Sequence, residues 1–96
     1  MLFVIRCLDK PDQAPVRAET RPRHLAYIDA HASQVRFAGP MLSDDETPIG
    51  SIFVMAFEGR ADAERYIAAD PYVLAGIFGT VEITRTRQVV PAETAP

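Results

Sequence analysis

The sequence has few of the residues that build disulfides and metal centres. Its 96 residues include one cysteine, Cys7, and two histidines. A single cysteine excludes an internal disulfide and a zinc site built from several cysteines. Two histidines cannot supply the three ligands of a three-histidine metal site. We therefore expect no metal centre of these kinds.

Long apolar runs and an excess of basic charge are also missing. The longest apolar stretches are far shorter than the ~20 residues that cross a bilayer. Residues 1–6 show neither the basic segment nor the cleavage site of a signal peptide. The net charge is −3, whereas nucleic-acid-binding domains carry an excess of basic charge. These absences predict a cytoplasmic domain that binds neither membrane nor nucleic acid.

The composition that remains is that of one globular domain. Apolar residues make up 48% of the chain and charged residues 24%, proportions that argue against wholesale disorder. A chain of 96 residues is long enough for one hydrophobic core and too short for two. We expect a single domain over residues 1–90 and a loose tail over residues 91–96, because that tail has no large apolar residues to bury against a core.

The order of strand-forming and helix-forming segments predicts a βαββαβ chain. Strands are expected over residues 2–8, 35–38, 49–57 and 78–90, and helical segments over residues 13–34 and 61–69. Pro22 is expected to break the first helical segment and begin its second part, with Thr20 as the cap. The second helix is expected to end at Asp70, because the residue before a proline avoids helical geometry. Such a chain predicts the ferredoxin-like α+β fold, a four-stranded antiparallel sheet with two helices on one face.

The first and third predicted strands carry apolar residues on both of their faces. In the ferredoxin-like order these two strands are central. Because two helices cover only one face of the sheet, the other face would expose a large apolar patch to water, which soluble monomers rarely do. We therefore expect a homodimer in which the two helix-free sheet faces pack together.

His24 and Asp70 are the candidates for acid–base chemistry. Helical spacing puts His24 on the sheltered side of its helix, and the predicted helix start near Pro22 would disfavour the imidazolium form. Such a histidine is either a general base or a buried residue with a structural role. Asp70 either accepts a hydrogen bond from His24 or only caps the turn at Pro71.

Other polar residues leave similar alternatives open. Arg6 lies within an apolar strand and needs a partner, which is either a carboxylate across the dimer or an anionic ligand. Cys7 is expected to be a small buried residue, and His31 a half-exposed one. The acidic segment Asp44–Glu46 is either a solvated loop or a weak site for a divalent cation.

Three segments together resemble the signature segments of the YciI-like, or YCII-related, family. They are Arg21-Pro22-Arg23-His24-Leu25, Ala38-Gly39-Pro40-Met41 and Ala69-Asp70-Pro71-Tyr72-Val73-Leu74-Ala75-Gly76. The order and spacing of the three make the resemblance specific, and it extends over residues 1–90. The resemblance implies a dimeric α+β barrel of ferredoxin-like domains, with His24 and Asp70 paired in a pocket beside the sheet.

The resemblance also suggests a class of reaction. Some relatives look like enzymes that eliminate chloride from hydroxylated aromatic rings, and the fold is shared with muconolactone-type isomerases. We therefore expect a lyase or isomerase that acts on a small cyclic or aromatic substrate without a cofactor. His24 and Asp70 would be its acid–base pair, and Arg6 and Tyr72 would line the pocket. The alternative is a non-catalytic dimer that binds a small ligand.

Overall fold

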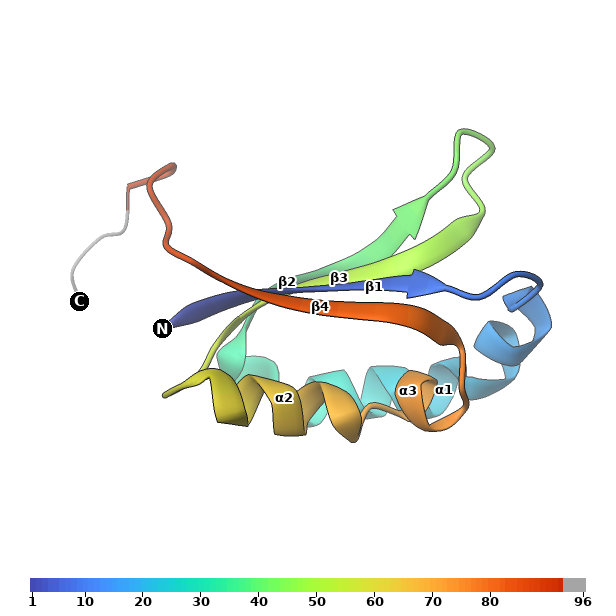
Figure 1. The fold of residues 1–96 in the computed structure, drawn as a ribbon, viewed down its shortest axis with the longest axis horizontal. Coiled ribbons are helices and arrows are strands. Elements are labelled where there is room, and N and C mark those ends of the chain that lie inside the picture. The colour runs from blue at the N-terminus through green and yellow to red at the C-terminus, as the bar shows by residue number, and fades with distance from the viewer. Residues whose placement is uncertain (93–96) are drawn as a thin grey trace.

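A computed structural model describes residues 1–92 of the chain, and residues 93–96, most of the predicted tail, lie outside this range. The described residues form four strands, three α-helices and one short 3₁₀ helix (Figure 1). In order they are β1 (Leu2–Asp9), α1 (Ala14–Ala30), the short 3₁₀ helix η1 (Ala32–Gln34), β2 (Val35–Leu42), β3 (Pro48–Ala56), α2 (Arg60–Ala68), α3 (Pro71–Leu74) and β4 (Phe78–Thr86). Within residues 1–92, no helix is long and apolar enough to span a membrane.

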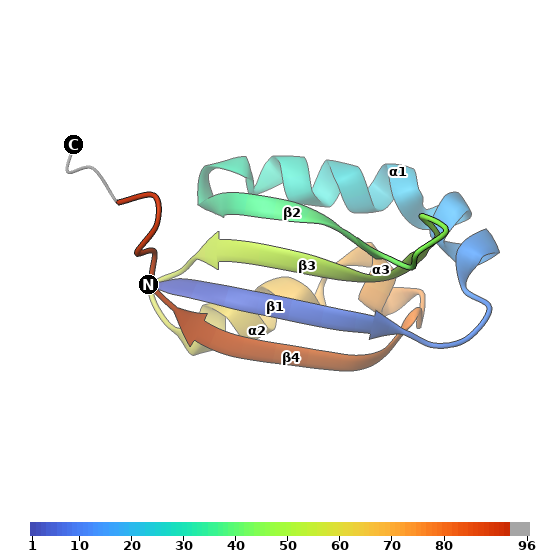
Figure 2. The same ribbon diagram turned by 90° about the horizontal axis from the view of Figure 1, so that it is seen from above.

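The strands form one antiparallel sheet in the order β2-β3-β1-β4. All three helices lie on the same face of this sheet (Figure 1). Seen from above, α1 runs along the β2 side, whereas α2 lies beneath β1 and β4 (Figure 2). The predicted ferredoxin-like α+β fold is confirmed, including the central positions of the first and third strands.

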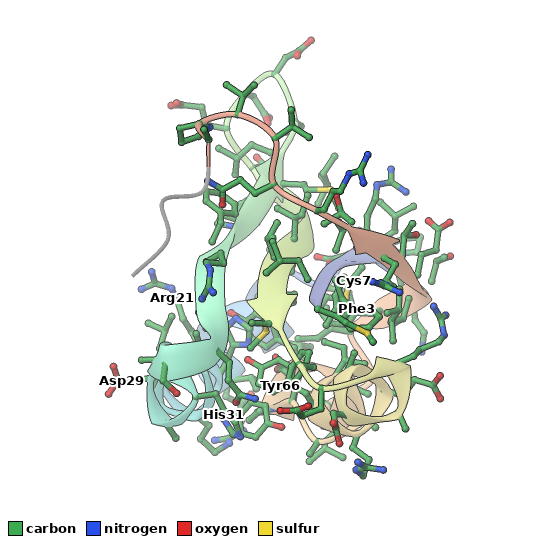
Figure 3. All side chains as sticks on the ribbon, turned by 90° about the vertical axis from the view of Figure 1, so that its left-hand side faces the viewer. Phe3, Cys7, Arg21, Asp29, His31 and Tyr66 are labelled. Carbon is green, nitrogen blue, oxygen red and sulfur yellow. The ribbon has the colours of Figure 1, made fainter. Side chains whose placement is uncertain are left out.

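The core lies between the sheet and the helices. Alternate residues of β1 point into it, so Phe3, Ile5 and Cys7 are buried, while their neighbours lie on the helix-free face. Figure 3 shows Tyr66 in the helix layer, on the side of the sheet toward which Phe3 points. The buried apolar residues form one cluster that consists of Phe3, Ile5, Cys7, Phe53, Met55, Phe57, Ala63, Tyr66 and Ile67.

The last strand is shorter than predicted. It ends at Thr86 and not at Val90, because Thr86 pairs with Leu2, the first residue of the neighbouring β1. Beyond that point β1 offers no backbone groups with which a longer β4 could pair.

The first helix corrects the prediction of a break at Pro22. α1 runs unbroken from Ala14 to Ala30, with Pro15 in its first turn and Pro22 in its interior. Pro15 takes the role predicted for Pro22, since the first-turn N–H groups have no partner within the helix. Thr20 is a buried residue of the helix and not its cap. His24 therefore lies mid-helix, and the argument from the positive end of the helix does not apply to it.

Asp70 also occupies a different helix end from the one predicted. The second helix, predicted over residues 61–69, is α2 and ends at Ala68; Asp70 is the N-cap of the separate helix α3, which begins at Pro71. Its Oδ1 accepts a hydrogen bond from the backbone N–H of Tyr72 at 2.8 Å. The carboxylate thus lies where free N–H groups favour negative charge, and the expected penalty for a carboxylate at a helix C-terminus is absent.

Candidate active site

A cavity of about 460 Å³ opens between α1 and the β2–β3 hairpin. The hairpin bends away from the helix layer at the end of the sheet where its turn lies (Figure 1). Most of the cavity's lining residues come from α1 on one side and from the two strands on the other, and Tyr72 of α3 also contributes. Its lining residues are Ala14, Arg17, Ala18, Arg21, His24, Leu25, Ile28, Ala38, Gly39, Pro40, Pro48, Ser51, Phe53 and Tyr72.

His24 lines this cavity, and it contacts Asp70, which is buried and does not line the cavity. Nδ1 of His24 lies 2.9 Å from Oδ1 of Asp70, within the hydrogen-bond distance expected from the sequence. Asp70 is fully buried, and His24 is 7% exposed. The same oxygen of Asp70 also caps α3. The carboxylate therefore has both of the roles considered for it, as the partner of His24 and as a cap beside Pro71. Among residues 1–92, its other oxygen, Oδ2, has no hydrogen-bond partner.

The imidazole of His24 is fixed by aromatic neighbours as well. It stacks on the ring of Tyr72 with centroids 3.7 Å apart and planes 9° from parallel. Phe53 meets it edge-on at a centroid distance of 6.2 Å. The stacked contact with Tyr72 and the edge-on contact with Phe53 leave the imidazole little room to rotate. Together with Asp70, they hold one ring orientation and leave Nε2 as the nitrogen free for chemistry.

Tyr72 was predicted to line the pocket, and it does. Burial is the main cause that raises the pKa of its phenol, while the cationic Arg17 and Arg21 act in the opposite direction. The hydroxyl donates a long hydrogen bond of 3.4 Å to the backbone carbonyl of Arg17. Tyr72 is therefore a neutral, oriented ring at neutral pH.

Arg17 is a wall residue that the sequence analysis missed. Its Nε and NH2 donate to the two carboxylate oxygens of Asp9 at 2.6 and 2.9 Å, and NH2 also donates to Oγ of Ser51 at 3.0 Å. The guanidinium carbon lies 4.9 Å from the centroid of the Tyr72 ring. A buried pair of this kind is costly to break, since removal of one partner typically costs about 3–5 kcal/mol.

Arg6 does not lie in this cavity. Its side chain is exposed on the helix-free face, where NH1 donates to Oε1 of Glu82 at 3.0 Å. Glu82 is the residue opposite Arg6 in the neighbouring strand β4. The partner that Arg6 needs is thus found within its own sheet, and the structure does not bring Arg6 together with His24.

Cys7 and His31 lie elsewhere in the fold. Burial, followed by the charge of Asp70, raises the pKa of the Cys7 thiol to about 12, so the thiolate is not formed at neutral pH. His31 is half-buried, and its Nδ1 lies 2.9 Å from the carbonyl oxygen of Tyr27. His31 packs against Tyr66 in the helix layer (Figure 3).

The acidic loop shows only local contacts. Oγ of Ser43 donates to Asp45, and the backbone N–H of Thr47 donates to the same carboxylate. These bonds lower the pKa of Asp45. In the part of the chain that the structure describes, no three His, Cys, Asp or Glu side chains gather as a metal site would require.

The family comparison identifies the same family that the three sequence segments resemble. A family model described as "YCII-related domain" matches residues 1–87. The chain is 34% identical to protein YciI of Escherichia coli O6:H1 over 97 aligned positions, which cover 93% of this chain and 99% of that protein. Protein YciI of Shigella flexneri matches with the same identity and coverage.

Solved structures share the fold. A 5-chloro-2-hydroxyhydroquinone dehydrochlorinase from Burkholderia phenoliruptrix AC1100, in complex with 2,5-dihydroxybenzoquinone, superposes with a TM-score of 0.86 at 29% identity. The superposition covers 93% of this chain and 96% of that one. Rv0793 from Mycobacterium tuberculosis superposes with a TM-score of 0.53 at 15% identity over 96% of this chain and 97% of that one. The second likeness shows a common fold alone.

Proposed function

The chain belongs to the YCII-related domain family, and from this premise we propose that it is a small enzyme of lyase or isomerase type acting on a cyclic or aromatic substrate. In this proposal His24 is the general acid/base and Asp70 orients it. The observation that carries the proposal is the 2.9 Å contact between Nδ1 of His24 and Oδ1 of Asp70, beside a largely apolar cavity that His24 lines. Similarity to a dehydrochlorinase along most of the chain supports the class of reaction.

The contact with Asp70 sets the tautomer of His24. An ionised carboxylate only accepts hydrogen bonds, so Nδ1 carries the hydrogen, and in the neutral imidazole Nε2 then carries the lone pair. Nε2 removes one proton from the substrate, and the electron pair of that bond shifts into the ring. In a lyase, this electron pair expels a leaving group as an anion. In an isomerase, it moves a double bond, and the proton returns at another atom of the substrate. Such a proton transfer requires no cofactor.

The neighbours of His24 keep the reaction in a fixed geometry. Tyr72 and Phe53 contact two sides of the imidazole, which limits its rotation and its access to water. A positioned acid/base group of this kind typically contributes ~10²–10⁴-fold to a rate. The substrate ring would lie against the apolar wall that Leu25, Ile28 and Pro40 provide.

The proposed working form is a homodimer in the cytoplasm, as the sequence predicts. The helix-free face of the sheet carries Val4 and Val54 side by side on the central strands. Phe37, which pairs with Val54 from the edge strand β2, is 56% exposed. A second copy of this sheet would cover the apolar face that no helix covers.

Turnover by two variants of the pair tests the proposal. We expect the wild type to convert at least one compound in a set of chlorinated hydroquinones, small hydroxylated aromatics and lactones. With that substrate, His24→Gln and Asp70→Asn should each lower kcat by roughly 10²-fold or more. The double variant should be little worse than either single variant, because the two residues act as one unit.

His31→Gln is the matched control, because it changes the second histidine, which does not line the cavity. It should retain the wild-type rate. Parental turnover by both His24→Gln and Asp70→Asn would overturn the acid–base proposal. A wild type that binds members of the set without converting any of them would favour the ligand-binding alternative.

A further inference from the structure

The charge of the cavity wall differs from the charge of the chain. The chain carries a net charge of −3, yet among residues 1–92 no aspartate or glutamate lines the cavity. The charged lining residues are two arginines, Arg17 and Arg21. An apolar, partly enclosed site with cations and no carboxylates on its wall favours an anionic ligand, because a low dielectric environment strengthens that attraction.

The two arginines differ in what they bind. Arg17 is 8% exposed, and both oxygens of Asp9 together with Ser51 accept hydrogen bonds from its Nε and NH2. Its charge is therefore largely balanced within the protein. Arg21 is exposed and makes no ion pair or side-chain hydrogen bond with any residue of the described range 1–92. Arg21 thus brings an unbalanced positive charge and free donors to the cavity.

Helical spacing places Arg21 on the same face of α1 as His24. Residues 17, 21 and 24 follow one another at four- and three-residue intervals along α1, so they form a row on one face of the helix. All three line the cavity. The positive charge of Arg21 also acts to lower the pKa of the Tyr72 phenol, and the Tyr72 ring stacks on His24 with centroids 3.7 Å apart. A ligand small enough for the cavity can reach Arg21 and His24 at once.

We propose that the cavity takes a small ring compound bearing an ionised oxygen, and that Arg21 binds this oxygen while the ring lies against the apolar wall near His24. This inference rests on the proposed function and deepens it by naming the charge of the substrate. Guanidinium groups bind carboxylates and similar oxygen anions through paired, charge-assisted hydrogen bonds. The same contact would hold negative charge that develops on the ring when His24 removes a proton.

Binding of two ligands with the same shape and different charge tests the inference. Benzoate is the anionic probe, and benzamide is its neutral counterpart. NMR titration of the full chain should show that the wild type binds benzoate more tightly than benzamide, and that added salt weakens the binding of benzoate. Arg21→Gln should weaken benzoate binding roughly 10- to 100-fold and leave benzamide binding within about twofold. Arg21→Lys should retain part of the preference.

Arg23→Gln is the matched control, since Arg23 is an exposed arginine of the same helix that does not line the cavity. It should bind both probes as the wild type does. Equal affinity of the wild type for the two probes, binding of neither, or parental benzoate binding by Arg21→Gln would overturn the inference. These titrations need no turnover, so they separate this inference from the acid–base proposal, which the variants of His24 test.

Discussion

Tyr66 carries a buried hydroxyl that has no hydrogen-bond partner within residues 1–92. The side chain is 4% exposed and packs against the rings of Tyr27, His31 and Phe57. Burial raises the pKa of its phenol, so the hydroxyl is neutral at physiological pH. Its transfer from water to the core costs free energy that no described hydrogen bond offsets.

Replacement of Tyr66 by Phe should therefore leave the free energy of unfolding unchanged or raise it by up to about 1 kcal/mol. Tyr27→Phe is the matched control, because the Tyr27 hydroxyl donates to the carbonyl oxygen of Tyr66 at 2.7 Å. Loss of that bond should lower the free energy of unfolding by about 1 kcal/mol. Urea denaturation measures both. A loss of about 2 kcal/mol or more in Tyr66→Phe would show that its hydroxyl has a partner, such as a bound water.

Some residues of the site could be predicted from the sequence, and others could not. The pairing of His24 with Asp70 was predictable because each lies in a recognisable segment, although the helix-end arguments used for both were wrong. Arg17 was missed because its partners, Asp9 and Ser51, come from β1 and β3. One signal could have found it, since Arg17 precedes His24 by two helical turns on the same face.

At the scale of elements, the order of the β-strands was predicted correctly, whereas the unbroken course of α1 was not. Strand positions follow from short apolar runs bounded by turns, and these occur near Pro11 and Gly59. For α1, two prolines compete for the first helical turn, and local pattern does not choose between them. Packing of the whole helix against the sheet favours an unbroken helix, which carries Pro22 in its interior despite the local cost.

The interior position of Pro22 in α1 leads to a testable prediction for stability. Pro22 lacks the N–H that would bond to the carbonyl of residue 18, and it is exposed, so its side chain contributes little packing. Pro22→Ala should raise the free energy of unfolding by roughly 1–2 kcal/mol, less than the ~3 kcal/mol helix penalty of proline because alanine adds entropy to the unfolded chain.

Thermal and urea denaturation check this expectation. Pro15→Ala is the control, because Pro15 is in the first turn, where a missing N–H costs no helical bond. It should not stabilise the protein. Destabilisation by Pro22→Ala would mean that the proline ring itself supports the geometry of α1.

At the scale of the whole molecule, the sheet has one face covered by helices and one that is not. Val54, on the central strand β3, is half-buried on the uncovered face, opposite Val4 and Phe37. If two copies pack through this face, an arginine at position 54 would bring two unpaired charges into the dimer interface. We therefore expect the wild type to be dimeric at micromolar concentration and Val54→Arg to be monomeric there.

Sedimentation velocity distinguishes the two states. Leu74→Arg is the control, since Leu74 is 74% exposed on α3, in the helix layer away from the uncovered face. It should remain dimeric. A wild type that sediments as a compact monomer, or a Val54→Arg variant that is folded and dimeric, would contradict the proposed assembly.

The row of Arg17, Arg21 and His24 on α1 also limits how descendants of this chain can diverge. One turn of an α-helix holds about 3.6 residues, so inserting or deleting a residue between positions 17 and 24 would rotate one end of the row by roughly 100°. Substitutions within this stretch change side chains one at a time, whereas a change in its length would separate Arg17 from His24. Length variation is better tolerated in the β2–β3 turn at residues 43–47, which lies outside the helix. Lineages that retain this cavity should therefore keep the length of the helical stretch constant while that turn lengthens and shortens.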